Sequence, residues 1–170
     1  MHLYRYLGTV ELLVETARWQ INALTDLEAW YKCVYGDTAT FVVTADGVLW
    51  LADQRSEHVS CARGADVLAA GELTFSESEL IAATNLSTGY CPEPECWQAL
   101  QAVLDRLGLT HSGSFTTSYL FRRCEHCGQR NVIKDRVFEC GVCGAALPKF
   151  WNCDPMVASG ASQVDELSRG

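Results

Sequence analysis

The chain has 170 residues, of which 48% are apolar and 20% are charged, with a mean hydropathy of +0.01 and a formal net charge of −8. This composition is typical of an ordinary water-soluble globular protein, and nine cysteines are too few for a disulfide scaffold. The longest apolar runs fall far short of the roughly 20 residues that cross a bilayer, and no long apolar region follows the N-terminus, so we expect neither a membrane span nor a secretory signal.

A strand and a helix are the first elements that the sequence predicts. Thr9–Glu15 has a β-like composition, and the apolar residues after it recur at helical spacing. Thr25, with Glu28 three residues later, has the pattern of a capped helix start. We therefore expect a strand over Thr9–Glu15 and a helix from Thr25 to about Val34.

Two β-hairpins follow. Residues 40–44 and 48–52 are β-rich runs on either side of an Asp46-Gly47 turn, which is among the stronger short-range hairpin signals. Val67–Phe75 and Glu79–Thr84 form a second pair of runs across a three-residue turn. We expect both pairs to be antiparallel.

The segment around the second hairpin contains residue types that carry chemistry, namely His58, Glu72, Asn85, Ser87 and Tyr90. A carboxylate within an apolar strand must face solvent, pair with a cation or lie in a polar pocket. One hypothesis is that these five residues form a catalytic pocket for a polar small molecule or nucleotide, as in an ADP-ribosyltransferase-like transferase. The alternative is that they only shape turns and hairpins.

The same segment resembles a domain shared by plant IQ-motif calmodulin-binding proteins and by predicted bacterial toxin modules. The resemblance covers residues 58–92 and depends on the spacing of a few residues. The matching residues are His58, Gly64, Val67, Ala70, Gly71, Glu72, Asn85, Ser87, Tyr90 and Pro92. Thr88 and Gly89 stand where that pattern has glycine and histidine. The resemblance implies a related fold more than an activity.

An amphipathic helix and a further strand complete the first part of the chain. Glu95–Leu107 places its large apolar residues on one face, and Gly108 is positioned to end the helix. Phe115–Arg122 is a strand candidate that leads into a cysteine-rich segment. The order of these elements predicts an α+β fold of mixed hairpins and helices, not a doubly wound sheet.

Two Cys-x-x-Cys pairs, each followed by glycine, predict a metal site. Two intervening residues let both thiolates of a pair reach one ion from a single tight turn, and the glycine permits the positive φ that such a turn needs. Four soft thiolates favour one structural Zn²⁺ ion. We therefore predict a zinc ribbon with short strands at Asn131–Ile133 and Arg136–Phe138. Its predicted ligands are Cys124, Cys127, Cys140 and Cys143.

A redox dithiol and an iron–sulfur cluster are the alternatives, and the doubled motif favours zinc. His126 could replace a cysteine ligand, but with four thiols present we expect it to be exposed. We expect Cys153 to pack with the aromatic residues beside it. Cys91 and Cys96 lie at a helix start, where a thiol pKa can fall, so a reactive cysteine is possible there, although small buried residues are favoured.

Other single residues have simpler expected places. We expect Cys33 and Cys61 in the core and His111 in an exposed loop. Cysteines used as metal ligands are typical of a reducing compartment, so we expect a cytoplasmic protein.

The chain is expected to have three parts. Residues 1–120 form the α+β body, residues 121–153 the zinc ribbon, and residues 154–170 a mobile tail with few large apolar side chains. Together the body and the ribbon resemble uncharacterised bacterial zinc-ribbon proteins.

Charge separates these parts. Residues 1–119 carry six basic and fifteen acidic residues, whereas residues 120–150 carry six basic and three acidic residues. Only the ribbon could therefore attract a phosphate backbone.

Three function hypotheses follow. The leading one is a binding or interaction module with a protein partner, as a component of a larger bacterial system. The second is an enzyme that uses His58, Glu72, Asn85 and Tyr90. The third is a protein that binds nucleic acid through its ribbon. The basic residues that support the third are Arg122, Arg123, Arg130, Lys134 and Arg136. The oligomeric state is left open by the sequence.

Overall fold

The computed structural model describes residues 1–155, in which an antiparallel sheet is combined with helices. The elements, in chain order, are η1 (Val10–Leu12), β1 (Arg18–Ile21), α1 (Leu24–Cys33), β2 (Thr38–Thr44), β3 (Leu49–Asp53), α2 (His58–Cys61), β4 (Val67–Ser76), β5 (Glu79–Thr84), η2 (Pro94–Cys96), α3 (Trp97–Leu107), β6 (Phe121–Arg123) and β7 (Arg130–Val132). The predicted α+β class is confirmed.

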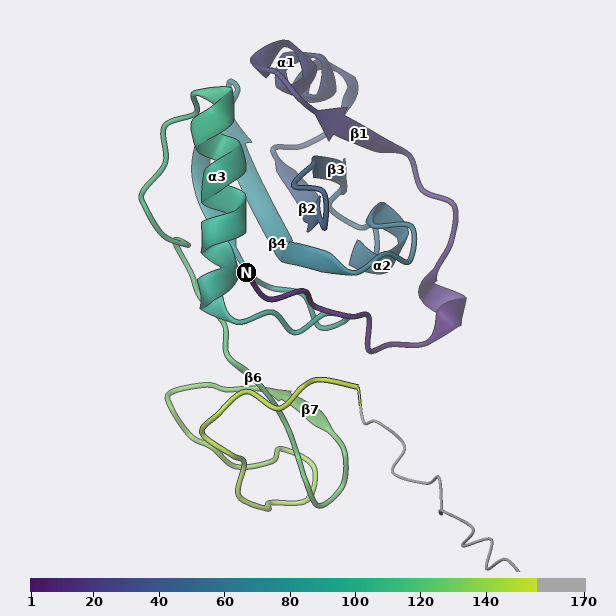
Figure 1. The fold of residues 1–170 in the computed structure, drawn as a ribbon, viewed down its shortest axis with the longest axis vertical. Helices are drawn as coiled ribbons and strands as arrows, with labels where there is room; N and C mark the ends of the chain where they lie inside the picture. The colour runs from purple at the N-terminus through teal and green to yellow at the C-terminus, as the bar shows by residue number, and fades with distance from the viewer. Residues whose placement is uncertain (156–170) are drawn as a thin grey trace, which may run out of the picture.

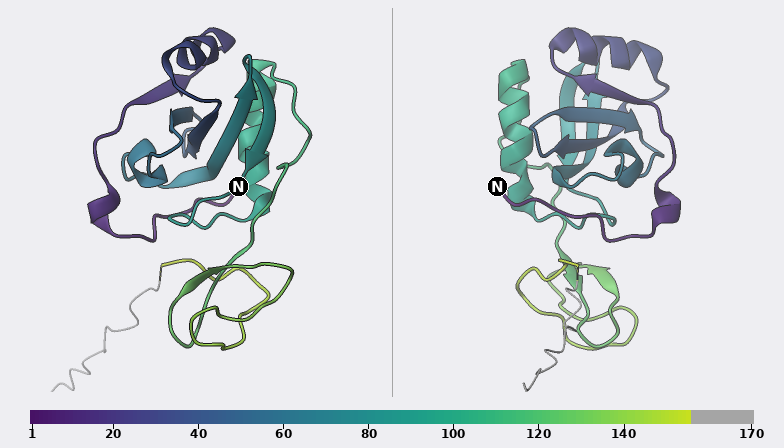
Figure 2. Two further views of the ribbon diagram at one scale, coloured as in Figure 1. Left: turned by 180° about the vertical axis from the view of Figure 1, so that it is seen from behind. Right: turned by 45° about the vertical axis from the view of Figure 1, so that its right-hand side comes forward.

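The larger part of the molecule is built on a five-stranded sheet with the order β1-β3-β2-β4-β5. Helix α3 lies along β4, and α1 packs against β1 at one end of the sheet (Figure 1). The small β6-β7 sheet and the cysteine-rich loops lie at the opposite end of the long axis, as the further views in Figure 2 also show. The molecule therefore has a larger sheet-and-helix part and a smaller cysteine-rich part.

Both predicted hairpins are present. β2 pairs with β3 around the Asp46-Gly47 turn, where the Gly47 N–H donates to the Thr44 carbonyl at 2.8 Å and Gly47 has a φ of +77°. β4 pairs with β5 across residues 76–79. Both pairings are antiparallel, as the alternation of β-rich runs and turn residues predicts.

The region before β1 differs from the prediction. Thr9–Glu15 is not a strand, because it contains the single 3₁₀ turn η1, and the strand forms later as β1, which pairs with β3. The Ser60 hydroxyl holds this region by accepting the Val14 N–H at 3.0 Å and donating to the Leu12 carbonyl at 2.8 Å. A side chain thus takes the place of a partner strand, and β composition alone did not reveal this.

Helix α1 starts at Leu24, so the predicted Thr25 cap is wrong. The Asp26 carboxylate accepts the N–H groups of Asn22 and Ala23 at 2.9 and 3.0 Å, and it therefore satisfies backbone donors at the start of the helix. Thr25 lies inside the first turn. The predicted helix end near Val34 agrees with the structure, in which α1 ends at Cys33.

Helix α3 agrees with its predicted pattern. Its buried face includes Leu100, Val103 and Leu104, and Gly108 ends it in the left-handed conformation at a φ of +72°. The first residues of the predicted helix instead form the 3₁₀ turn η2, which begins at Pro94. Burial of this face against the sheet fixes the position of α3.

The predicted strand over Phe115–Arg122 is mostly irregular, since only Phe121–Arg123 pairs regularly, as β6 with β7. Thr117 makes one isolated bridge to Thr84 at the edge of the larger sheet. Hydrogen bonds between Thr116 and Ala83 and between Tyr119 and Asn85 also hold this connection against the end of β5.

The N-terminal segment runs between the larger and smaller parts (Figures 1 and 2). Tyr4 exchanges two backbone hydrogen bonds with Val67, and the Leu7 N–H donates to the Gly89 carbonyl at 2.8 Å. The Arg130 guanidinium then donates to the Leu7 carbonyl at 2.7 Å. Residues that are distant in sequence thus join the two parts.

The predicted boundaries at residues 120 and 153 stay a prediction. Of the predicted tail, residues 154 and 155 are described, and the rest lies outside the described residues. Within residues 1–155, no helix is both long enough and apolar enough to cross a membrane.

Candidate metal centre

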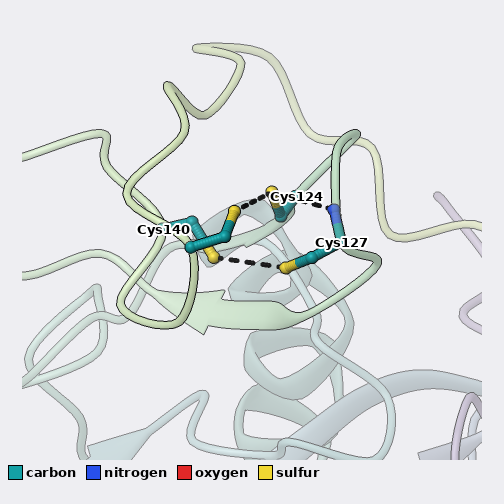
Figure 3. Close-up of side chains that lie close together, drawn as sticks. Cys124, Cys127 and Cys140 are labelled. Carbon is teal, nitrogen blue, oxygen red and sulfur yellow. Dashed lines mark hydrogen bonds between the residues drawn. The ribbon is translucent and has the colours of Figure 1, made fainter.

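Four cysteine sulfurs converge in the smaller part of the molecule. The Sγ atoms of Cys124, Cys127, Cys140 and Cys143 all lie within 4.8 Å of one another. The Cys124–Cys143 and Cys127–Cys140 sulfur pairs are each 3.6 Å apart (Figure 3). Each of these close contacts joins one Cys-x-x-Cys pair to the other, so the cluster holds the two loops together.

The two loops have the same backbone hydrogen bonds. In the first, the Gly128 N–H donates to the Cys124 carbonyl at 2.9 Å, and the Cys124 N–H donates to the Gln129 carbonyl at 2.8 Å. In the second, Gly144 and Cys140 make the equivalent bonds at 2.9 and 2.8 Å. Both glycines have positive φ, +77° and +71°. The glycine after each pair therefore closes the turn, as the sequence predicts.

The spacing of the sulfurs fits a tetrahedral metal ion. Bonds of about 2.3 Å from a central ion to four sulfurs require sulfur–sulfur distances of about 3.8 Å, close to the 3.6 Å contacts. A disulfide would bring two sulfurs to about 2.05 Å. The cluster could therefore hold one metal ion with all four thiolates.

Backbone N–H groups favour the ionised form of two of these sulfurs. The Cys127 N–H donates to the Cys124 sulfur at 3.5 Å and lowers the pKa of that thiol. The N–H groups of Cys143 and Val142 lower the pKa of the Cys140 thiol to about 6. Thiolates, not thiols, bind metal ions, so these loops are preorganised for a cation.

Asn131 supports the cluster from β7. Its side-chain amide donates to the Cys140 sulfur at 3.5 Å, and its Oδ1 accepts the Gly141 N–H at 3.0 Å. This residue fixes the second loop on the strand that follows the first. No sequence signal marks this role, because Asn131 lies outside both pairs and only the folded chain brings it to Cys140.

The rest of the ribbon prediction has a mixed outcome. The strand predicted at Asn131–Ile133 is β7, shifted by one residue, whereas Arg136–Phe138 is not a strand and contributes only an isolated Lys134–Val137 bridge. His126 is exposed and outside the cluster, as expected.

Arg122 ties the cysteine-rich part to the sheet-and-helix part. Its buried guanidinium donates to Glu93 Oε1 at 2.8 Å and to the Lys149 carbonyl at 2.9 Å. Asn152 clamps Arg123 by accepting its N–H and donating to its carbonyl, both at 2.8 Å. Two basic residues proposed for nucleic-acid contact, Arg122 and Arg130, are therefore bonded within the chain.

His58, the first of the predicted catalytic residues, is half-buried at the start of α2. Its Nε2 lies 2.9 Å from the Gly71 carbonyl oxygen in β4. A carbonyl only accepts hydrogen bonds, so the neutral ring carries its proton on Nε2. Burial lowers the pKa of His58 to about 4, which favours this neutral, donating form.

The chain passes very close to itself at Gly71. A Cβ added to Gly71 would lie 1.9 Å from the Thr84 carbonyl oxygen, because the end of β5 crosses directly over it. Glu72, the next residue, is half-buried and pairs with Thr40 and Thr84 in the sheet. The Ala-Gly-Glu part of the motif thus requires glycine for close backbone packing.

Asn85 and Tyr90 are bonded to backbone groups. The Asn85 amide donates to the carbonyls of Pro92 and Tyr119, each at 2.8 Å, and its oxygen accepts the Tyr119 N–H at 2.7 Å. The Tyr90 hydroxyl donates to the Ala65 carbonyl at 2.7 Å, and burial raises its pKa. The Ser87 hydroxyl is buried without a partner among the described residues.

These central residues are close in the fold, but most of their polar atoms are used by the backbone. A cavity of about 600 Å³ lies instead between the start of α1, the β4–β5 turn and the end of α3, where Glu28, Glu77 and His111 line it. Another, of about 340 Å³, lies beside β7. None of the four predicted catalytic residues lines either cavity. Their catalytic role stays a prediction.

Two single-residue expectations are wrong. Cys33, at the end of α1, is exposed instead of buried. His111 is half-buried, because its Nε2 bonds to Asp105 at 2.8 Å and its ring packs against Trp97. Cys61 is buried as expected.

Cys91, Cys96 and Cys153 are buried as well.

Comparisons of the chain with protein-family models, with curated proteins and with solved structures find no match. With four converging sulfurs, closed loops and supporting N–H donors, the cysteine cluster could hold a metal ion without a further protein ligand.

Proposed function

We propose that the protein is a zinc-ribbon protein of a reducing compartment whose ribbon binds a protein partner. The observation that carries the proposal is the convergence of four cysteine sulfurs within 4.8 Å on two closed loops. All-sulfur tetrahedral sites with this loop spacing suit Zn²⁺, and four protein ligands leave no position for a reacting water. The zinc ion therefore stabilises the ribbon and takes no part in a reaction.

Exposed apolar side chains on the ribbon support a binding role. Val142, inside the second cysteine loop, is 70% exposed, Phe150 is 67% exposed, and Val137 is 58% exposed. Large apolar groups on short loops cost free energy in water, and a partner surface that covers them recovers it. Because the zinc ion fixes the loops, the partner meets a rigid surface and loses little of its binding energy to ordering them.

The charge of the ribbon limits which protein surfaces it can bind. The same part of the chain carries the basic residues Arg123, Lys134, Arg136 and Lys149, whereas residues 1–119 carry an excess of nine acidic charges. Unlike Arg122, these four are not buried. A partner that docks on the ribbon should therefore present an apolar surface rimmed by acidic side chains.

Affinity capture with matched variants tests the proposal. The bait is the full chain, zinc-loaded, and the variants are Val142→Ser with Phe150→Ser, and Val10→Ser as the control. Val10 is 77% exposed but lies in η1, away from the ribbon. The expected result is a protein that is captured and then shown to bind directly when purified, with binding roughly tenfold weaker for the ribbon variant and unchanged for the control.

Removal of zinc should abolish the same interaction. Binding that survives in the ribbon variant and without metal would contradict the proposed role of the ribbon. A captured nucleic acid, whose binding weakens steeply with added salt, would contradict the protein partner.

A further inference from the structure

We propose that Cys91 and Cys153 form a redox-active dithiol, which a peroxide oxidises to a disulfide that links the sheet-and-helix part to the segment after the ribbon. Cys91 lies between β5 and η2, and Cys153 follows the cysteine loops, 62 positions later. Neither of them belongs to the cluster of Cys124, Cys127, Cys140 and Cys143. The site is therefore chemically separate from the proposed zinc centre.

The two thiols lie together in one small apolar cluster. Cys91, Cys153 and Phe121 are all buried there and pack in the same cluster. The Trp151 indole donates to the Cys91 carbonyl at 2.8 Å. This contact anchors the chain two residues before Cys153 and holds the two sulfurs near one another. Both cysteines are free thiols in this structure.

The surroundings give the two thiols different roles. The Cys91 thiol donates to the Thr88 carbonyl at 3.3 Å, and the neighbouring Cys153 sulfur, together with burial, raises the pKa of Cys91. The neighbouring Cys91 thiol lowers the pKa of Cys153, with help from the positive charges of Arg122 and Arg123. Cys153 is therefore the nucleophilic thiolate, and Cys91 is the thiol that resolves it.

Other buried cysteines show the contrast. Burial raises the pKa of Cys61 and of Cys96 to about 12 each, as expected for inert structural thiols. The Cys61 thiol donates to the Trp50 carbonyl. A second thiol and two nearby guanidinium groups distinguish Cys153 from both.

A route for a small oxidant reaches Cys91. The cavity of about 340 Å³ beside β7 is lined by Thr88, Cys91 and Phe121 on one side and by residues 128–132 on the other. Hydrogen peroxide is little larger than water and fits such a space. The cavity therefore gives a peroxide access to the Cys91 side of the pair, against which Cys153 packs, without unfolding of the ribbon.

The reaction balances with one peroxide. The Cys153 thiolate attacks one peroxide oxygen, the O–O bond breaks, and the released hydroxide takes a proton to leave as water, so that Cys153 becomes a sulfenic acid. The Cys91 sulfur then attacks the Cys153 sulfur, an S–S bond forms, the S–O bond breaks, and the second water carries the Cys91 proton. The sulfur pair loses two electrons and the peroxide gains them. A dithiol reductant reverses the step.

Peptide mapping of peroxide-treated protein tests the proposal. The zinc-loaded full chain is treated with equimolar hydrogen peroxide, alkylated and digested without reduction, and zinc content is measured in parallel. We expect a Cys91–Cys153 linked peptide, roughly tenfold more abundant than any other cysteine pair and removed by dithiothreitol. Zinc should be retained, and Cys96→Ser, as the matched control, should form the same link.

The Cys91→Ser variant should accumulate sulfenic acid on Cys153, which dimedone traps. If that variant does not fold, the unaltered chain in glutathione redox buffers gives the same answer, because the linked fraction must follow the ratio of oxidised to reduced glutathione. Full oxidation of the exposed Cys33 with no Cys91–Cys153 link, or a link that appears only after zinc is lost, would overturn the proposal. Neither result depends on whether the ribbon binds a partner.

Discussion

The cysteine ribbon and the central segment from His58 to Pro92 both stand out in the sequence as clusters of reactive residue types, but the fold uses them differently. In the ribbon, four sulfurs lie within 4.8 Å of one another, and N–H groups of Cys127 and Asn131 donate to two of them. In the central segment, His58, Asn85 and Tyr90 are bonded to backbone carbonyls of other segments. The cysteine motif leaves its sulfurs available to a ligand, whereas the central segment uses these polar groups to stabilise the fold.

A substitution in the cysteine cluster should have the largest effect of the changes described below. Cys140→Ser removes one of the four proposed ligands and the sulfur that Asn131 contacts. Structural zinc contributes about 10 kcal/mol or more to the folding of small metal-dependent units, so we expect loss of tight zinc binding and of ribbon structure. Metal content and hydrogen exchange of residues 124–147 measure this. Cys33→Ser is the control, and a Cys140→Ser chain with undiminished zinc affinity would contradict the account.

Gly71→Ala tests the fastening role of the central segment. The added Cβ would lie 1.9 Å from a backbone oxygen, and neither chain can move without disturbing β4 or β5. We expect a loss of about 3 kcal/mol or more in the free energy of unfolding, or no folded protein. Gly47→Ala, in open space at a φ of +77°, should cost about 1 kcal/mol. Denaturant unfolding measures the free energy of unfolding of both variants. Equal losses would contradict the close approach of the two backbone segments at Gly71.

The pH dependence of stability tests His58. Its pKa is about 4 in the folded chain and about 6.5 in the unfolded chain, so the unfolded state binds a proton more readily between these values. Stability from this group is complete above about pH 6.5 and declines as the pH falls towards 4. His58→Gln keeps an N–H donor for Gly71 and should flatten that decline when zinc saturation is matched. An unchanged slope would contradict a neutral His58 in the folded chain.

Glu72→Gln gives the smallest expected effect on stability. Within residues 1–155 the structure shows no hydrogen bond or ion pair of the Glu72 carboxylate, so we expect a change of less than about 0.5 kcal/mol in unfolding free energy. Melting curves measure this. If the variant instead loses an enzymatic activity of the chain while its melting curve is unchanged, the hypothesis of a catalytic pocket would replace the fastening role.

Sequence reasoning succeeded where the decisive contacts are local. The Asp46-Gly47 hairpin, the face of α3 ended by Gly108, and the cysteine spacing all depend on residues a few positions apart. The strand predicted at Thr9–Glu15 does not form, because these residues have β composition but no neighbouring strand to pair with. The Ser60 hydroxyl makes hydrogen bonds to their backbone instead.

The residues that complete the sites depend on contacts across the chain. Asn131 reaches Cys140 only because β7 folds beside the second loop, and Cys91 meets Cys153 only because the ribbon docks on the N-terminal segment and on Glu93. No local pattern marks such residues, since their neighbours are set by the tertiary fold. The motif at His58–Glu72, in contrast, stands out in the sequence. Close backbone packing at Gly71 requires a specific residue type, as a catalytic site also does.

X-ray absorption spectroscopy of the purified full chain decides whether the cysteine cluster is a zinc centre, because it reports the identity of the metal and its ligands together. We expect one zinc ion per chain, bound by four sulfurs at about 2.3 Å with no oxygen or nitrogen ligand. Absence of zinc, an iron–sulfur signature, or a site with an open position filled by water would contradict it.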